Sequence, residues 1–186
     1  MNPPRVIGLD PSITATGIAW HDGSTTTTRD TTTIGDVRLD NIARWVGHAA
    51  QYHPGLLRRD EHGEDRRAHL AVIEDLPINA KGAGITGMAQ GVIRHTLLDC
   101  SVPYALVTPS GLKKYATGNG NANKSDMRMA LYKHTGLDLR DDNEVDAWWL
   151  RAMGLDHLGF PLVKLPQAQR AMLDKVTWPE FSEAGR

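Results

Sequence analysis

The sequence contains a single cysteine, Cys100, among its 186 residues. One thiol cannot form an internal disulfide framework or a zinc cluster of thiolates, and its apolar helical surroundings indicate a small buried residue. Long hydrophobic runs are also missing, because no stretch approaches the roughly 18 apolar residues that cross a bilayer. The first residues, MNPPRVIGLDPS, lack a secretory signal pattern. We therefore expect a soluble, cytoplasmic protein with no membrane partner.

The chain has almost no excess of charge of either sign, with a formal net charge of -1. This balance excludes a protein coated with basic surface, so any binding of nucleic acid must depend on a local patch. The length suits one domain with one core. We expect residues 1–157 to form that domain. Residues 158–186, with three prolines and mixed polarity, are expected to be an extension that is partly packed or flexible.

Apolar periodicity predicts an α/β fold. The expected order is β-β-β-α-β-α-β-α-α, with strands at residues 5–10, 16–20, 24–34, 69–75 and 103–107 and helices at residues 36–52, 82–100, 125–134 and 142–157. A short helical turn is expected after Pro109, and a charged loop at residues 56–67. The first two strands form a hairpin, and the third, rich in threonine, suits a solvated strand. We expect a central mixed five-stranded sheet flanked by helices, with the first three strands antiparallel and the fourth and fifth parallel to the first.

Three carboxylates stand where apolar elements begin or end. Asp10 and Glu74 close predicted strands, and Asp146 opens the apolar part of the last helix, DDNEVDAWWL. If the two strands are neighbours, the three acids converge, and they would raise each other's pKa unless a cation neutralised them. Oxygen ligands without a cysteine or histidine cluster select Mg²⁺ or Mn²⁺. Taken singly, each acid also has a purely structural interpretation, as a turn cap, a solvated strand end and a helix-surface residue.

A local basic segment lies between Pro109 and His134. It carries Lys113, Lys114, Lys124, Arg128 and Lys133 against one acid, Asp126, a local charge of +4. Glycines and asparagines at residues 118–123 let backbone amides approach a phosphate, and Ser125 can cap a helix whose N-terminus favours anions. We therefore expect DNA binding by Lys113, Lys114, Lys124, Ser125 and Arg128. An ordinary solvated helix with a flexible loop is the alternative.

Four segments in this order and spacing carry a family resemblance: VIGLDPSITATGIAW, AVIEDLP, LKKYATGNGNANKSD and NEVDAWW. Residues 5–152 resemble the RuvC family of Holliday junction resolvases, within the ribonuclease H-like superfamily. The resemblance implies a ribonuclease H-like fold and a crossover junction endodeoxyribonuclease of DNA recombination and repair. Asp10, Glu74 and Asp146 match three of the family's metal ligands. Lys113 and Lys124 match its two basic residues near the scissile phosphodiester.

The family's fourth ligand, acidic or histidine, lies three residues before the last aspartate. Here Asn143 stands at that position. Asn143 and Asp142 share the helical face of Asp146, whereas Glu144 points away. Asn143 can offer an amide oxygen, with Asp142 in reserve. Since a neutral ligand weakens the binding of a second ion, we expect a higher metal requirement or a preference for Mn²⁺.

The resemblance also implies a mechanism with two Mg²⁺ or Mn²⁺ ions in each active site. Asp10 would bridge both ions, and Glu74 and Asp146 would hold one each with Asn143. Lys113 or Lys124 would offset negative charge in the transition state. A homodimer would make paired nicks across a four-way DNA junction and leave ligatable 5′-phosphate ends. Flaps and forks present similar phosphates, so other branched DNA is also an expected substrate, and the shortened pattern suits a divergent, phage-type member.

Three further features bear on this interpretation. The tryptophans at positions 20, 45, 148 and 149 lie in apolar periodic runs and are expected in the core, with Trp178 undecided. Pro77 replaces an aromatic residue that many RuvC proteins carry at the junction centre. Gly87 and Gly91 permit close packing on a helix that contributes to a dimer in the family, or equally packing within the chain.

Two other functions are compatible with parts of the sequence. GLDPSITATG also resembles the first phosphate loop of actin-like and sugar-kinase ATPases, but neither a second lobe nor a second phosphate loop is found in 186 residues. A protein that binds junctions without cutting them is the third possibility, for which Asn143 is the only hint. Nicking of a synthetic junction distinguishes the nuclease from both.

Overall fold

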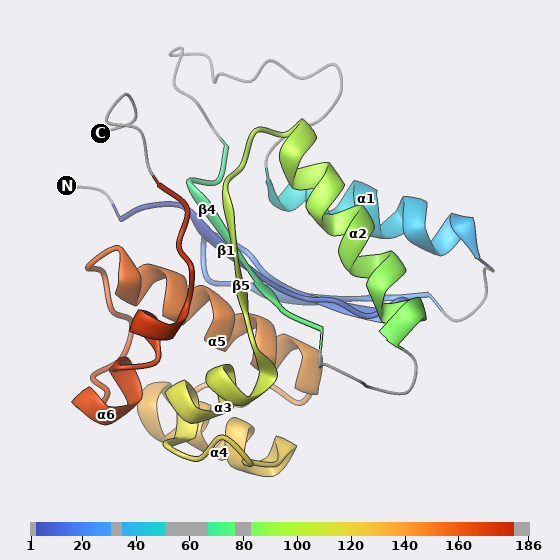
Figure 1. Cartoon of the computed structure of the whole chain (residues 1–186). Coiled ribbons are helices and arrows are strands. Elements are labelled where there is room, and N and C mark those ends of the chain that lie inside the picture. Colours follow the sequence, from blue (N-terminus) through green and yellow to red (C-terminus); the bar gives the residue numbers. More distant parts are fainter. Residues whose placement is uncertain (1–2, 31–34, 51–66, 77–82, 181–186) are drawn as a thin grey trace.

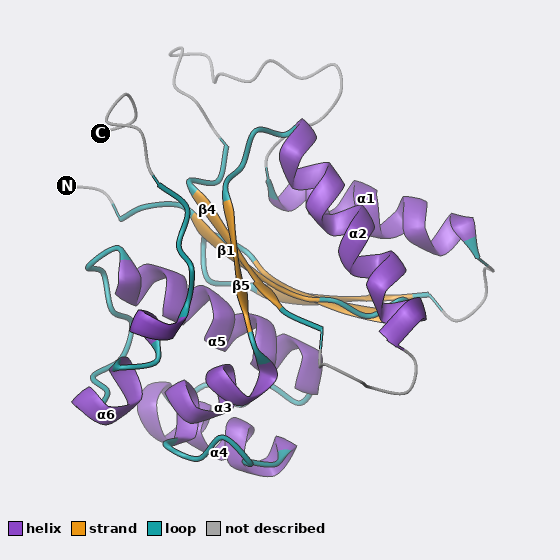
Figure 2. Cartoon of the chain, viewed as in Figure 1, coloured by secondary structure: helices purple, strands orange, loops and turns teal. Residues whose placement is uncertain are grey.

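The computed structural model describes residues 3–30, 35–50, 67–76 and 83–180. Its elements form three layers, with a twisted sheet between two groups of helices (Figure 1). Helices α1 (Asp36–Ala49) and α2 (Ala83–Asp99) cover one face of the sheet. The opposite face carries the long helix α5 (Asp142–His157), with α3 (Pro109–Thr117) and α4 (Lys124–Thr135) packed beside it. Figure 2 shows the same layers by secondary structure.

The sheet has the order β3-β2-β1-β4-β5. Its strands are β1 (Val6–Asp10), β2 (Ala15–Ala19), β3 (Thr25–Arg29), β4 (Leu70–Glu74) and β5 (Tyr104–Val107). The first three are antiparallel, and β4 pairs with both β1 and β5 in parallel. The predicted mixed sheet is confirmed. The third strand ends earlier than expected, at Arg29, and residues 31–34 of its predicted range lie outside the described residues. Pro77 and all but the last residue of the loop predicted at 56–67 also lie outside them.

Two helices differ from the prediction at their start. The turn after Pro109 is a helix of 9 residues, whose N-cap Thr108 accepts a hydrogen bond from the Gly111 amide. The prediction that Ser125 caps the next helix was wrong, because α4 begins one residue earlier and Asn123 is its cap. Asn123 and Asp126 form a reciprocal capping box, which satisfies two amides at that end. No helix in the described ranges is both long and apolar enough to span a membrane.

Alternation along β1 and β4 divides the core into two clusters. Ile7, Leu9, Ala71 and Ile73 face α1 and α2, whereas Val6, Leu70 and Val72 face α5. Because side chains alternate along a strand, the terminal residues Asp10 and Glu74 lie on the α5 face. The acids at the two strand ends therefore point to the layer that contains the third.

Helix α5 packs against the backbone of the sheet with almost no space between them. A Cβ atom on Gly8 would lie 2.0 Å from the carbonyl oxygen of Ala147, and one on Gly17 would lie 2.1 Å from that of Asn143. Only glycine permits this approach. Because Asn143 and Ala147 bracket Asp146, the contact fixes the height of Asp146 above the sheet.

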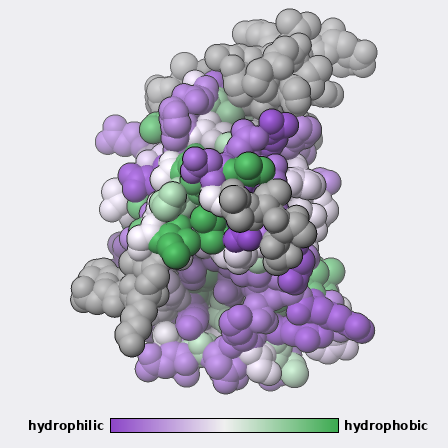
Figure 3. All heavy atoms as spheres, turned by 90° about the vertical axis from the view of Figure 1, so that its right-hand side faces the viewer, coloured by the Kyte–Doolittle hydropathy of each residue, from purple (hydrophilic) through white to green (hydrophobic). Residues whose placement is uncertain are grey.

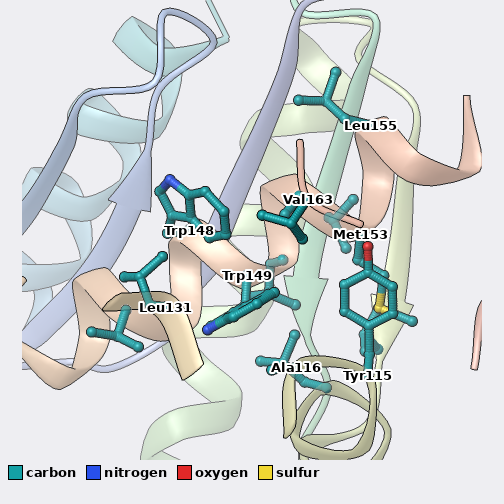
Figure 4. Packing of buried hydrophobic residues seen from close by; sticks show 14 of the residues in the cluster. Tyr115, Ala116, Leu131, Trp148, Trp149, Met153, Leu155 and Val163 are labelled. Carbon is teal, nitrogen blue, oxygen red and sulfur yellow. The ribbon is translucent and has the colours of Figure 1, made fainter. Parts of the chain in front are cut away.

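The tryptophans do not share one environment. Trp148 and Trp149 are buried between α5 and the helices beside it, with ring centroids 5.1 Å apart (Figure 4). The core prediction was wrong for Trp45, whose exposed fraction is 43%, and Trp20 is half-buried against it. Both lie on the side of the sheet that α1 covers, with their ring centroids 6.2 Å apart. The predicted burial of Cys100 is confirmed.

The described part of the C-terminal extension packs on the α5 side of the molecule. It includes α6 (Gln167–Arg170) and the 3₁₀ turn η1 (Leu173–Lys175). Half-buried apolar residues of this segment, among them Phe160, Leu165 and Trp178, lie against the core cluster. Trp178 also stacks on His157 with ring centroids 4.0 Å apart.

Candidate active site

Asp10 and Glu74 end two neighbouring parallel strands. The register pairs Leu9 with Ile73, so the residues that follow, Asp10 and Glu74, lie side by side at the same edge of the sheet. Asp10 is 8% exposed, and each of the two carboxyl groups acts on the pKa of the other. Two acids in contact at a buried strand edge are unfavourable for folding, so this placement indicates a chemical use.

Burial and mutual repulsion perturb the acidity of this pair. The pKa of Asp10 is raised well above its ordinary value, chiefly by burial and then by the charges of Glu74 and Asp146. Burial and the charge of Asp146 raise the pKa of Glu74 to about 7. The two groups therefore resist carrying two negative charges together unless a positive charge is nearby.

Asp146 reaches the same place from the first part of α5. Its pKa is raised to about 6, chiefly by burial and in smaller part by the charge of Asp142, while Lys113 and Lys124 act in the opposite direction. Its charge acts on both Asp10 and Glu74. Within the described residues, however, no three acidic, histidine or cysteine side chains are arranged as a complete ligand set around one point. The three acids form a direct pair with a third carboxylate coupled to it through charge.

Lys113 and Lys124 bring positive charge to the carboxylates from two different helices. Half-buried Lys113 on α3 lowers the pKa of Glu74 and of Asp146, and Lys124 lowers those of Asp10 and Asp146. The Lys124 ammonium donates a hydrogen bond of 2.9 Å to Asp142, which raises the pKa of the lysine. The structure thus brings both predicted lysines to the predicted acids, although neither helix is adjacent in sequence to β1 or β4.

Asn143 lies over the strand next to Asp10. Its backbone approaches Gly17, and Gly17 is the residue that pairs with Asp10 across the β1–β2 ladder. The Asn143 side-chain amide donates a hydrogen bond of 3.0 Å to Asp141, which leaves the amide oxygen of Asn143 for another partner. Asp142 is instead engaged by Lys124.

The other predicted DNA-binding residues lie on the outer side of the same helices. Lys114 and Ser125 are exposed, whereas the Arg128 guanidinium donates to Asp138 at 3.0 Å. The amides at the start of α4, next to Lys124, lie at the positive end of that helix. The basic segment is therefore split between residues at the carboxylates and residues facing outward.

Sequence reasoning missed the residues that anchor the start of α5. Asp141 caps the helix by accepting from the Asn143 backbone amide at 2.9 Å, and Arg29 of β3 pairs with Asp141. Thr25, also on β3, donates to Glu144 at 2.6 Å. The aspartate before a predicted helix was a readable capping signal, but its partners on β3 are more than 100 positions away and left no local pattern.

Comparison with known proteins gives relatives of one kind. No protein-family model matches the chain. A crossover junction endodeoxyribonuclease RuvC from Nocardia farcinica is 30% identical over 141 residues, which cover 72% of this chain and 70% of the relative. A protein of the same name from Frankia casuarinae is 26% identical over 156 residues, covering 83% of this chain and 88% of that protein.

Solved structures show the same fold. The structure of Thermus thermophilus RuvC matches with a TM-score of 0.61 at 18% identity, covering 84% of this chain and 97% of that one. RuvC from the same organism in complex with a Holliday junction substrate matches with a TM-score of 0.62 at 20% identity, covering 84% of this chain and 93% of that one. The expected ribonuclease H-like architecture is thereby confirmed. By its sequence relatives and its fold, the chain belongs to the RuvC family of crossover junction endodeoxyribonucleases.

Proposed function

We propose that this chain is a metal-dependent endonuclease that resolves Holliday junctions, and cuts other branched DNA, by paired nicks. The observation that carries the proposal is the convergence of Asp10, Glu74 and Asp146 with Lys113 and Lys124. Three acids beside two lysines form a place where a phosphodiester can meet both a cation and ammonium groups. The family relatives are named for that reaction. A cytoplasmic location, in contact with cellular DNA, accompanies this proposal.

The donor set fits a hard divalent cation. It consists of carboxylate oxygens that are largely buried and that repel one another, as their raised pKa values express. We propose that Asp10, Glu74 and Asp146 hold Mg²⁺ or Mn²⁺, with two ions in each site. Bound there, the ions would supply Lewis acidity for the attack of water on the phosphodiester.

Asn143 is proposed as the fourth ligand, through its amide oxygen. Its side-chain nitrogen donates a hydrogen bond to Asp141. Its backbone lies over Gly17, the residue that pairs with Asp10. Asp142 has a different role in this proposal, because it holds the Lys124 ammonium at 2.9 Å. A neutral fourth ligand binds a cation less tightly than a carboxylate, so the enzyme should need more metal.

The two lysines act on the substrate rather than on the fold. Lys113 is half-buried beside the acids, so its ammonium can contact a non-bridging oxygen of the phosphate and offset the charge that develops there. Lys124 is more exposed, with 76% of its side chain accessible, and can exchange Asp142 for a phosphate when DNA binds. Outside the carboxylate site, Lys114, Ser125 and Arg128 would contact the DNA backbone without reading its sequence.

A homodimer is part of the proposal, since paired nicks need two active sites. Helix α2 exposes large apolar side chains: Ile85 is 56% and Met88 48% exposed. A Cβ atom on Gly91 would meet nothing within 4 Å, so Gly91 packs against no part of the described chain, whereas Gly87 lies near Leu76. Figure 3 shows apolar surface on the side of the molecule where α1 and α2 lie. We propose that a second copy covers this face.

Cleavage of a synthetic four-way junction tests the function. The protein, a labelled junction and either Mg²⁺ or Mn²⁺ are incubated, and the products are resolved on a denaturing gel. Symmetric nicks in two opposing strands, absent with linear duplex, are expected. Tight binding without product would support a protein that only binds junctions. ATP hydrolysis without nicking would support the ATPase interpretation.

A further inference from the structure

The C-terminal extension holds the helix that carries Lys113. After α5 the chain turns back, and α6 packs against α3 (Figure 1). Two consecutive residues near the end of α6, Gln169 and Arg170, make the polar contacts. Neither residue belongs to the carboxylate site, and both lie in the extension beyond residue 157.

Arg170 neutralises a buried carboxylate on α5. The Asp156 side chain has an exposed fraction of 0%, and Arg170 binds it in a forked arrangement, with Nη2 at 2.7 Å from Oδ1 and Nε at 3.1 Å from Oδ2. A carboxylate so buried is strongly unfavourable unless it is paired and hydrogen-bonded. Arg170, although itself exposed, is therefore the partner on which the buried Asp156 carboxylate depends.

The same carboxylate holds α3. The Tyr115 hydroxyl, on α3, donates a hydrogen bond of 3.0 Å to Asp156 Oδ2. Burial and the neighbouring Asp156 charge raise the pKa of Tyr115, so its hydroxyl keeps the proton that it donates. Figure 4 shows the Tyr115 ring among the apolar side chains beside α5.

Gln169 fixes the end of α3. Its side-chain amide donates a hydrogen bond of 2.8 Å to the backbone carbonyl of Tyr115, one of the last carbonyls of the helix. Gly118, the left-handed C-cap of α3, lies against the Gln169 side chain. The helix is thus held at its side by Asp156 and at its end by Gln169.

This docking sets where Lys113 lies. Lys113 precedes Tyr115 by two residues on α3, and its charge acts on Glu74 and Asp146. Asp146 lies near the start of α5, the helix whose later part carries Asp156. The position of Lys113 relative to Asp146 therefore depends on how α3 is packed against α5. Arg170 and Gln169 complete the contacts that hold α3 there.

We propose that Arg170 and Gln169 are positioning residues of the nuclease, which act through Tyr115 and α3 to keep Lys113 at the carboxylates. This inference rests on the proposed function. A misplacement of about 1 Å in an active site can cost on the order of a hundredfold in rate. The extension would then serve cleavage, not only stability.

The first test compares Gln169→Ala and Arg170→Met with Gln167→Ala, an exposed control on the same helix. Single-turnover cleavage of a synthetic junction is measured at saturating protein, well below the melting temperature of every variant. We expect the rate to fall about tenfold for Arg170→Met and about threefold for Gln169→Ala, with junction affinity unchanged. Arg170→Lys should recover part of the loss. Equal rates for all variants would overturn the inference.

A double-mutant cycle separates positioning from general weakening. In a Lys113→Met background the Arg170→Met change should have no further effect on the cleavage rate, because the group that it positions is gone. An equal loss in both backgrounds refutes the route through Lys113.

A chemical measurement completes the test without using activity. Lysine acylation is followed by mass spectrometry, residue by residue, in the full-length protein. Lys113 should react about threefold faster in Gln169→Ala and Arg170→Met, because its half-buried position is lost, while Lys114 keeps its rate. An unchanged Lys113 rate contradicts the inference, even if no junction is cut and the proposed function itself fails.

Discussion

Gly8 of β1 lies directly beneath the backbone of Ala147 on α5: a Cβ atom on Gly8 would be 2.0 Å from the Ala147 carbonyl oxygen and 2.7 Å from the Arg151 amide nitrogen. Both neighbours are backbone atoms in a helix that is buried over most of its length. They cannot move without moving the helix. This contact sets the distance between the sheet that carries Asp10 and the helix that carries Asp146.

Replacement of Gly8 by Ala should therefore damage both the fold and the site. We expect a loss of about 2 kcal/mol or more in unfolding free energy, because α5 must rise from the sheet. Chemical denaturation monitored by tryptophan fluorescence measures it. Gly84→Ala is the control, since nothing lies within 4 Å of its Cβ position on α2, and it should be neutral or slightly stabilising. A Gly8→Ala protein as stable as the wild type would contradict the packing described.

Replacement of Glu74 by Gln should stabilise the protein when no divalent metal is present. Burial raises the pKa of Glu74 to about 7 from an ordinary 4.5, so the folded chain binds this proton more tightly than the unfolded chain. Stability is then lost as pH rises from about 4.5 to about 7, by up to about 3 kcal/mol. The Glu74→Gln variant has no carboxyl group to ionise at this position, so its stability should not fall in this way.

Melting temperatures in EDTA at pH 5 and pH 8 test the prediction. The wild-type chain should melt lower at pH 8 than the Gln variant does, and the gap should narrow at pH 5. Glu180→Gln, at an exposed position, is the matched control. Added Mg²⁺ or Mn²⁺ should raise the wild-type value and leave the Glu74→Gln value nearly unchanged. A less stable Gln variant at pH 8 would show that the Glu74 charge is already compensated.

Replacement of Asp146 by Asn should abolish cutting and spare junction binding. The change removes a charge proposed to bind metal while preserving the shape of the side chain, and the outward residues Lys114 and Ser125 remain. Gel-shift affinity and nicking are measured on one labelled junction. Retained cleavage would refute the assignment of Asp146 as a ligand.

Replacement of Asn143 by Asp should lower the metal requirement. The new carboxylate would bind a cation more tightly than the amide does, by about tenfold in the Mg²⁺ concentration for half-maximal cleavage. Loss of the hydrogen bond that the Asn143 amide donates to Asp141 opposes this gain in metal binding.

The Asp142→Asn variant provides the comparison, because it should weaken the placement of Lys124 without changing the metal requirement. If Asp142→Asn raises that requirement and Asn143→Asp does not lower it, Asp142 is the fourth ligand. Saturation of the wild-type enzyme well below millimolar Mg²⁺ would also contradict a weak fourth ligand.

Charged substitution on α2 should dissociate the proposed dimer. Ile85→Asp and Met88→Asp place charge in the exposed apolar face, and each unpaired charge buried in an interface costs several kcal/mol. Analytical ultracentrifugation should report a monomer for the double variant and a dimer for the wild type. Leu98→Asp, another exposed apolar position on α2 but near its other end, is the control. A wild-type chain that sediments as a monomer at high concentration would exclude the dimer.

Much of the fold follows from local patterns. The predicted bounds of α5, residues 142–157, agree with the structure at both ends, although its cap Asp141 was missed. Local patterns did not indicate that Ile85 and Met88 are exposed, since periodicity identifies an apolar face but not what covers it. The cap at Asn123 rather than Ser125 was missed because the two residues offer the same type of acceptor, and only the backbone path distinguishes them.

By itself, the sequence determined the candidate residues: three carboxylates at element ends, two lysines in a basic segment, and an asparagine where the family has an acid or a histidine. The tertiary structure alone decided which of them lie near one another. Parallel pairing of β1 with β4 brings Asp10 beside Glu74, and the glycine contacts seat Asp146 above them. The docking of α3 on Asp156, Arg170 and Gln169 was decided in the same way. Such contacts join residues far apart in the chain, and their energies depend on burial and geometry, which no local pattern of residue types encodes.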